Sequence, residues 1–263
     1  MDSGPDLDEN LDRIERMTAR AASEGACLIC LPETANIIPE SNWAGRAESL
    51  DGPSLTRLKA LARSFGLWIH GGSILEKNPA GRPWNTSPLI DPAGRLAASY
   101  RKLHLFDAEV KDGPSVQESR HMAAGDRIVV SPTELGLFGL AICYDLRFPE
   151  LFRLMALRGA EVIFVPANFT SHTGRRHWES LLRARAIENA CYIVAAGQCG
   201  RKPGYQAHGH SLAVSPDGKI LGELGNEEAV LTIELDLEEV ARCRREIPGL
   251  QNRRDDIYHL SAL

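Results

Sequence analysis

Residues 135–159 read LGLFGLAICYDLRFPELFRLMALRG. The run that ends at Cys143 is almost wholly apolar, which predicts a β-strand buried on both faces. From Phe148 onward the apolar residues follow a helical spacing, and Pro149 suits the first turn of a helix. The stretch therefore predicts a strand followed directly by a helix, the unit from which α/β folds are built, with Cys143 at the corner between them.

The same succession of elements continues on both sides of this stretch. Residues 7–24 have the apolar spacing of an amphipathic helix, which Ser3 or Asp6 can cap. Two segments with similar turn residues, 87–100 and 211–224, predict hairpins, and either an internal duplication or convergent turn chemistry accounts for their similarity. The other predicted helices are 54–65, 178–190 and 237–246, and the other predicted strands are 26–32, 67–75, 128–132, 162–168, 191–199 and 229–236.

Length and charge narrow the class of protein. The chain has 263 residues, 30 Lys and Arg against 35 Asp and Glu, and a formal net charge of −5. This balance argues against nucleic acid or an anionic membrane as the main partner, since both require a clustered positive field. No apolar run is long enough to span a bilayer, and the acidic start does not resemble a signal peptide. We expect one domain over residues 1–263, located in the cytoplasm.

Two short motifs allow a metal or redox interpretation. Cys27 and Cys30 form a C-x-x-C pattern, although its setting in an apolar strand favours structural thiols. His208 and His210 could face one side of a strand as metal ligands, but no third ligand follows at a suitable spacing. Neither motif therefore predicts a metal site.

Three ionisable residues stand where chemistry is expected. Cys143 lies at a strand end before a helix, and the positive end of a helix favours the thiolate form of a cysteine. Glu33 ends an apolar strand and Lys102 follows another, positions where α/β sheets form ligand crevices. Taken separately, each of the three also fits a structural thiol or a solvated loop charge.

Four ordered blocks carry a family resemblance. LPETAN at 31–36, YRKLHLFD at 100–107, QES at 117–119 and AICYDLRFPE at 141–150 resemble the signature blocks of the nitrilase superfamily of carbon–nitrogen hydrolases. RRHWESLLRARAIENACYIVAAGQCG, AHGHS and SPDGKILGEL extend the resemblance over nearly the whole chain. The sequence is most similar to the branch that contains deaminated glutathione amidase and omega-amidase.

The resemblance implies a four-layer α-β-β-α sandwich and a Glu-Lys-Cys triad. Transferred to this sequence, Cys143 is the nucleophile, Glu33 the general base, Lys102 the oxyanion partner and Glu118 a supporting carboxylate. The backbone N–H of Tyr144 would share the oxyanion with Lys102. Such a site forms a thioester, releases ammonia and then hydrolyses the thioester with water, which requires no cofactor.

The substrate side of the site is less sharply defined. Arg147 could pair with a carboxylate of an α-keto-acid amide, or it could form a structural ion pair with Asp145 or Glu150. A pocket wall is expected at Asn168, Phe169 and Thr170.

Four functions remain open, the last of them a thiol-redox role for Cys27 and Cys30. The leading expectation is an amidase for deaminated glutathione that acts in metabolite repair, and the second is an omega-amidase for α-ketoglutaramate or α-ketosuccinamate. A non-catalytic binding or scaffold role is the third, since a fold does not guarantee activity. The resemblance also implies at least a homodimer.

The beginning of the chain departs from the family pattern. The family opens with a strand of the form V-x-x-x-Q-M before the first helix, whereas this sequence begins MDSGPDLDENLDRI. We therefore expect the first strand of the fold to be missing, which leaves a cavity and unpaired backbone groups. The same reasoning predicts that an N-terminal extension raises the melting temperature.

Overall fold

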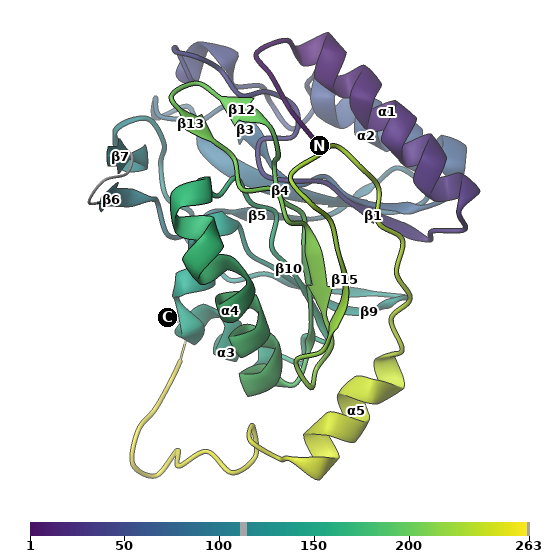
Figure 1. Ribbon diagram of the computed structural model, residues 1–263, viewed down its shortest axis with the longest axis vertical. Helices are drawn as coiled ribbons and strands as arrows, with labels where there is room; N and C mark the ends of the chain where they lie inside the picture. The colour runs from purple at the N-terminus through teal and green to yellow at the C-terminus, as the bar shows by residue number, and fades with distance from the viewer. Residues whose placement is uncertain (111–114, 262–263) are drawn as a thin grey trace.

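The computed structural model describes residues 1–110 and 115–261. Two β-sheets lie face to face, and helices cover their outer faces (Figure 1). Helices α1 (Leu7–Ser23) and α2 (Pro53–Phe65) pack together over the first sheet, whereas α3 (Pro149–Leu157) and α4 (Ser171–Asn189) cover the second. The α-β-β-α arrangement predicted from the resemblance is therefore confirmed.

The two sheets share one pattern of strand pairing. In the first sheet β1 pairs parallel with β2, and β4 and β5 follow antiparallel. In the second sheet β10 pairs parallel with β11, and β14 and β15 follow antiparallel. The two predicted hairpins, β4–β5 and β14–β15, thus hold equivalent positions in the two sheets.

The strands of the first sheet are β1 (Leu28–Cys30), β2 (Trp68–His70), β3 (Ile74–Glu76), β4 (Trp84–Ile90) and β5 (Leu96–Arg101). Those of the second sheet are β8 (Val130–Thr133), β9 (Gly136–Leu140), β10 (Val162–Phe164), β11 (Tyr192–Ala195), β14 (Leu212–Val214) and β15 (Ile220–Glu223). Two small hairpins are formed by β6 (Asp107–Glu109) with β7 (Ser115–Gln117), and by β12 (Arg201–Lys202) with β13 (Tyr205–Gln206). The remaining elements are α5 (Leu237–Glu246) and the short helices η1 (Ala44–Arg46), η2 (Glu118–Arg120) and η3 (Cys143–Arg147).

Several predicted strands are shorter in the structure: 162–168 and 191–199, for example, form β10 (Val162–Phe164) and β11 (Tyr192–Ala195). Three further predicted elements differ more. Residues 67–75 form two strands instead of one, because Gly72 has φ +62° and lies too close to the Pro32 carbonyl for any side chain. Helix α4 begins at Ser171, seven residues before the predicted start, because Thr170 caps it there. Residues 229–236 are extended, but they pair with no strand among the described residues, so the prediction of a strand there is wrong.

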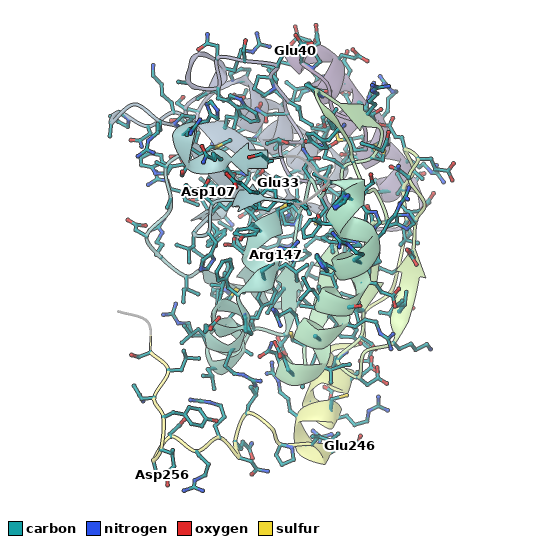
Figure 2. The ribbon with its side chains drawn as sticks, turned by 60° about the vertical axis from the view of Figure 1, so that its left-hand side comes forward. Glu33, Glu40, Asp107, Arg147, Glu246 and Asp256 are labelled. Atoms are coloured by element: carbon teal, nitrogen blue, oxygen red, sulfur yellow. The ribbon has the colours of Figure 1, made fainter. Side chains whose placement is uncertain are left out.

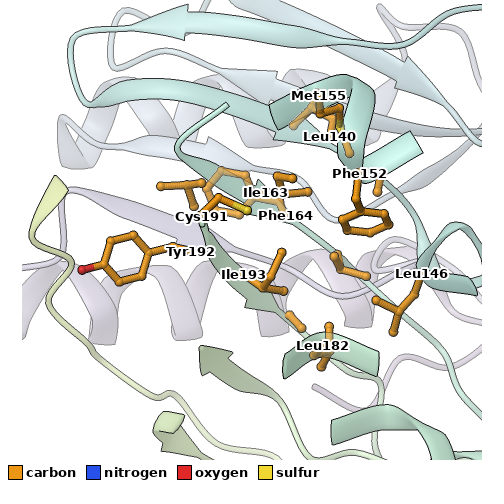
Figure 3. Packing of buried hydrophobic residues seen from close by; sticks show 14 of the residues in the cluster. Leu140, Leu146, Phe152, Met155, Ile163, Phe164, Leu182, Cys191, Tyr192 and Ile193 are labelled. Carbon is orange, nitrogen blue, oxygen red and sulfur yellow. The ribbon is translucent and has the colours of Figure 1, made fainter. Parts of the chain in front are cut away.

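The core lies between the sheets and under α3 and α4. Figure 3 shows the part of it in which Phe152, Met155 and Leu182 of the two helices pack against Ile163 and Ile193 of β10 and β11. Each of these side chains is at most 2% exposed. This packing fixes the ends of the central strands, where the candidate site residues lie. In the described part of the chain no helix has the length and apolarity needed to cross a membrane.

Candidate active site

The backbone at Cys143 is held in an unusual conformation. Cys143 follows β9, has φ +48° and begins η3. Its N–H donates to the Pro166 carbonyl at 2.9 Å. Positive φ is rare for residues with a Cβ and persists only where the surroundings fix it, which marks Cys143 as a functional position.

Asp145 helps to hold the backbone at Cys143 in this conformation. It is fully buried, and its Oδ2 accepts from the Ile142 N–H and from the Tyr100 hydroxyl, each at 2.8 Å. Its Oδ1 accepts from the His104 N–H at 3.0 Å and lies 2.7 Å from His104 Nδ1. From the sequence, Asp145 is expected only as an ion-pair partner of Arg147. The structure shows that it ties the Cys143 turn to the segment after Lys102.

Lys102 lies between two carboxylates. Its Nζ donates to Glu33 Oε1 at 3.0 Å and to Glu118 Oε1 and Oε2 at 3.0 and 2.9 Å. The Lys102 side chain is 2% exposed. A buried ammonium group requires such pairing, because an isolated charge away from water is very costly. Three of the residues predicted from sequence are thus in direct contact.

The Glu33 carboxylate is fixed at both oxygens. Oε1 also accepts from Asn85 Nδ2 at 2.8 Å, and Oε2 accepts from the Asn168 backbone N–H at 2.8 Å. The Glu33 carbonyl accepts from Gln198 Nε2 at 2.9 Å. Sequence reasoning missed both residues, since Asn85 precedes the predicted hairpin 87–100 and Gln198 lies near the end of the predicted strand 191–199.

The protonation states follow from burial and from these charges. Burial and the negative charge of Glu33, which also accepts a hydrogen bond from the thiol, raise the pKa of Cys143 well above its usual value, although Lys102 opposes the shift. Burial disfavours the charge on Lys102, but Glu118 and Glu33 outweigh it and raise the Lys102 pKa well above its usual value. The resting site therefore contains a neutral thiol and a charged lysine. The expectation of a thiolate at this corner is wrong, because burial and Glu33 dominate.

The three residues predicted to form a pocket wall follow β10 and have different surroundings. Asn168 lies against Glu33, and its Nδ2 donates to the Tyr205 hydroxyl at 2.7 Å. Phe169 is 7% exposed and packs against Trp178 with ring centroids 4.9 Å apart. Thr170 is the N-cap of α4 instead, and accepts from the Thr173 N–H. Tyr205, on the small hairpin β12–β13, was not predicted from the sequence.

Arg147 lies beside these aromatic residues. Its guanidinium lies 5.4 Å from the Phe169 ring centroid and 5.8 Å from that of Tyr144, and its Nη1 is 3.3 Å from His177 Nδ1. Within residues 1–110 and 115–261 Arg147 forms no ion pair, so the pairing with Asp145 or Glu150 that the sequence left open does not occur. Figure 2 shows Glu33 and Arg147 near the middle of the view, whereas Glu40 and Glu246 lie toward its two ends.

The two motifs with a metal or redox interpretation lie elsewhere. Cys27 is exposed and unbonded to Cys30, whose Sγ is 3.4 Å from His70 Nδ1. The rings of His208 and His210 stack at 4.4 Å, and His210 Nδ1 is 2.8 Å from Glu223. Among the described residues no three His, Cys, Asp or Glu side chains gather as metal ligands.

Comparisons with known proteins agree with this geometry. Residues 1–245 match the family described as carbon-nitrogen hydrolase. The chain belongs to this family. Among curated carbon–nitrogen hydrolases, the omega-amidase of Xenopus tropicalis is 38% identical over 97% of this chain and 92% of its own length. The deaminated glutathione amidase of Synechocystis is 38% identical over 96% and 95%. The protein is accordingly a hydrolase of carbon–nitrogen bonds.

Solved structures of the family superimpose closely. The Caenorhabditis elegans NitFhit structure has a TM-score of 0.90 and 36% identity, and the match covers 99% of this chain and 65% of that chain. The chain spans 60% of the length of the curated NitFhit protein. A mutant of the amidase of Nesterenkonia has a TM-score of 0.81 and 30% identity over 97% of this chain and 92% of that chain. It was solved with the acetamide moiety of fluoroacetamide added covalently at its active-site cysteine.

Proposed function

We propose that this carbon–nitrogen hydrolase cleaves the amide of a small α-keto dicarboxylic acid by way of a thioester on Cys143, with deaminated glutathione as the main substrate. The observation that carries the proposal is a buried group of ionisable side chains. Lys102 is paired with Glu33 and Glu118, and the charges of Glu33 and Lys102 act on the pKa of the Cys143 thiol. A scaffold has no need of this arrangement, because a buried ion pair is a poor source of stability compared with apolar packing.

The first half of the reaction begins from the neutral thiol. Glu33 takes the thiol proton as the Cys143 sulfur attacks the amide carbonyl carbon, forming the C–S bond. Lys102 and the Tyr144 N–H stabilise the oxygen that becomes negative, an effect of about 3 kcal/mol per donor in other enzymes. Glu33 then gives its proton to the departing nitrogen, the C–N bond breaks, and the amine leaves.

The second half regenerates the enzyme. Glu33, again a carboxylate, takes a proton from water, whose oxygen attacks the thioester carbonyl. The same donors stabilise the second tetrahedral intermediate, the C–S bond breaks, and the sulfur recovers the proton from Glu33. The acid product then leaves. The contacts from Asn85 and the Asn168 N–H hold Glu33 in one orientation through both halves.

Arg147 supports a carboxylated substrate. Its guanidinium has no carboxylate partner among the described residues and lies next to Phe169 and His177. A buried or half-buried cation without a partner gains most from a ligand anion, and arginine binds carboxylates through two parallel hydrogen bonds. We therefore assign Arg147 to the distal carboxylate of the substrate and Phe169 to the pocket wall.

The two candidate substrates differ in what leaves. Glutathione is γ-glutamyl-cysteinyl-glycine, so cleavage of its deaminated form releases the dipeptide cysteinylglycine and not ammonia. Our expectation of ammonia as the general product is therefore wrong for this substrate. Both candidates, deaminated glutathione and α-ketoglutaramate, release α-ketoglutarate, whereas only the second releases ammonia.

The decisive experiment offers the purified protein both substrates in parallel. α-Ketoglutarate is measured as the common product, and cysteinylglycine and ammonia identify the leaving group. We expect a higher kcat/KM for deaminated glutathione, abolished by Cys143→Ala. A preference for α-ketoglutaramate supports the omega-amidase alternative, which stays open because a curated omega-amidase and a curated deaminated glutathione amidase are equally identical to this chain, at 38%. A folded protein inactive on both substrates would contradict the proposal.

We also propose the cytoplasm as the compartment and a homodimer as the minimal assembly. All six cysteines are free in the structure, which is typical of proteins in a reducing compartment. Light scattering of the purified protein tests the assembly.

A further inference from the structure

Four side chains from three segments form a closed ring of contacts next to the catalytic residues. Arg147 of η3, labelled in Figure 2, has its guanidinium carbon 5.4 Å from the centroid of the Phe169 ring. Phe169 packs against Trp178 of α4, with ring centroids 4.9 Å apart. His177, the residue before Trp178, closes the ring, since its Nδ1 lies 3.3 Å from Arg147 Nη1. His177 and Trp178 have no part in the proposed reaction.

The contact between Arg147 and His177 fixes the position of a proton. A guanidinium group carries only donors, so Nδ1 of His177 is the acceptor and the imidazole proton is on Nε2. The ring is therefore neutral. Burial, followed by the positive charges of Arg147 and Arg176, lowers the pKa of His177 and keeps it in this form. A neutral histidine beside two arginines accepts a hydrogen bond without adding a third positive charge.

The hydrogen bond to His177 adds a direction that the aromatic contacts of Arg147 lack. The rings of Phe169 and Tyr144 attract the guanidinium, at 5.4 and 5.8 Å, but this attraction does not fix where individual N–H groups point. Arginine binds a carboxylate through two parallel hydrogen bonds, which form only when its planar fork faces the ligand. One N–H held by His177 fixes the rotation of the fork and leaves the other N–H groups for a ligand.

Helix α4 provides a firm support for His177. The helix begins at Ser171 and is capped by Thr170, which places His177 in its second turn. Trp178 is 2% exposed, and its Nε1 donates to the His210 carbonyl at 2.7 Å. A side chain on a well-anchored helix positions its partner more precisely than one on a loop. An arginine held in this way has less conformational entropy to lose when its ligand binds.

We propose that His177 is a specificity-determining residue, whose neutral imidazole holds Arg147 with its free N–H groups turned toward the distal carboxylate of the substrate. The inference rests on the proposed function, which assigns Arg147 to that carboxylate. His177 acts through Arg147 and does not touch the ligand, so it is a positioning residue. The competing role is a direct one, in which His177 takes up a proton and binds the carboxylate as a second cation.

A double-mutant cycle on ligand binding separates the two roles. The probe is α-ketoglutarate, the acid that both candidate substrates release, and its Kd is measured by calorimetry on the full chain. We expect His177→Leu to raise this Kd about tenfold, because a hydrogen bond to a charged group is lost. In the Arg147→Gln background the same His177→Leu change should alter the Kd less than about twofold, since the group it positions is absent.

A conservative variant and a matched control accompany the cycle. The amide oxygen of His177→Asn can accept in place of Nδ1, so its Kd should stay within about threefold of the parent value. His259→Leu makes the same change at an exposed position and should bind as the parent does. A thermal melt of each variant shows whether it is folded, and the Asn variant tests the proposal even where the Leu variant is unstable.

Three results would overturn the proposal. A tenfold effect of His177→Leu that persists in the Arg147→Gln background would show that His177 binds the ligand directly. A Kd for His177→Asn raised as much as that of His177→Leu would show that the acceptor atom is not what matters. An unchanged Kd in Arg147→Gln would leave His177 nothing to position. Failure of the proposed function is seen separately, as absent turnover of both α-keto amides, because the Kd requires no turnover.

Discussion

The ammonium group of Lys102 donates to both carboxylate oxygens of Glu118, at 3.0 and 2.9 Å. Glu118 Oε2 also accepts from the Phe106 N–H at 2.6 Å, so the backbone too holds this carboxylate in position. The same ammonium group reaches Glu33 at 3.0 Å. Glu118 thus holds Lys102 in place and supports its charge, which leaves Glu33 free to exchange a proton with Cys143.

Removing the charge of Glu118 should shift the alkaline limit of activity. Glu118 is the largest of the charges that raise the Lys102 pKa, so Glu118→Gln lowers that pKa and Lys102 loses its proton at lower pH. We expect kcat to fall about 100-fold and the alkaline limb of kcat/KM to move to lower pH. The pH–rate profile measures both, and Glu40→Gln, at an exposed site, is the matched control. An unmoved alkaline limb would contradict the role of Glu118.

Glu33→Gln should slow turnover but make the Cys143 thiol more acidic. The variant lacks the general base, so we expect kcat to fall about 10³-fold. It also lacks the negative charge that raises the thiol pKa, so the Cys143 pKa falls. The rate of Cys143 alkylation by iodoacetamide, followed by mass spectrometry from pH 6 to 10, should then rise at lower pH than in the parent. A profile shifted to higher pH would show that Glu33 does not control the thiol.

Local pattern was sufficient to predict much of this structure. Periodic apolar residues predict α1, α2 and α5 within one residue at each end, since a helix is defined by contacts a few residues apart. Short motifs placed Glu33, Lys102, Glu118 and Cys143, which the fold then brings together. The capping prediction also succeeded for Asp6, which accepts from the Glu9 N–H.

Contacts between distant segments could not be predicted from the sequence. Glu33 and the Asn168 N–H are 135 residues apart, and Tyr100 and Asp145 are 45 apart. The prediction of a thiolate at Cys143 was wrong for a similar reason. The pKa of this thiol depends on burial and on the charges of Glu33 and Lys102, which lie far from it in the sequence. Residues 229–236 have strand composition, but a strand also requires a neighbour, which composition does not specify.

Arg147→Gln should weaken binding of carboxylated substrates selectively. If the guanidinium binds the distal carboxylate, its loss costs about 1.5–3 kcal/mol, which corresponds to about a 10- to 150-fold rise in KM. The kcat for a neutral amide such as propionamide should change little. Steady-state kinetics on both substrates provide the measurement, and Arg245→Gln on α5 is the exposed control. Equal losses on charged and neutral amides would assign Arg147 a structural role.

Tyr205→Phe tests whether the small hairpin β12–β13 supports the site. The Tyr205 hydroxyl accepts from Asn168, whose backbone N–H binds Glu33, so its loss lets the carboxylate move. One neutral hydrogen bond is worth about 1 kcal/mol, so we expect kcat to fall about fivefold with the melting temperature nearly unchanged. Steady-state kinetics and a thermal melt on the same sample separate the two effects. An unchanged kcat would exclude a positioning role.

His70 should make stability depend on pH below neutrality. It is fully buried between Cys30, Ser87 and Phe164, and burial lowers its pKa to about 3. The unfolded chain binds this proton near pH 6.5, so stability is complete above that pH and is lost as the pH falls from 6.5 toward 3. Between pH 7 and 5 the loss is about 2 kcal/mol. Urea unfolding at pH 7 and pH 5 measures this loss of unfolding free energy. We expect the loss to be about 2 kcal/mol smaller in His70→Gln and unchanged in the exposed control His259→Gln. An equal loss in the two variants would show that His70 is not the group responsible.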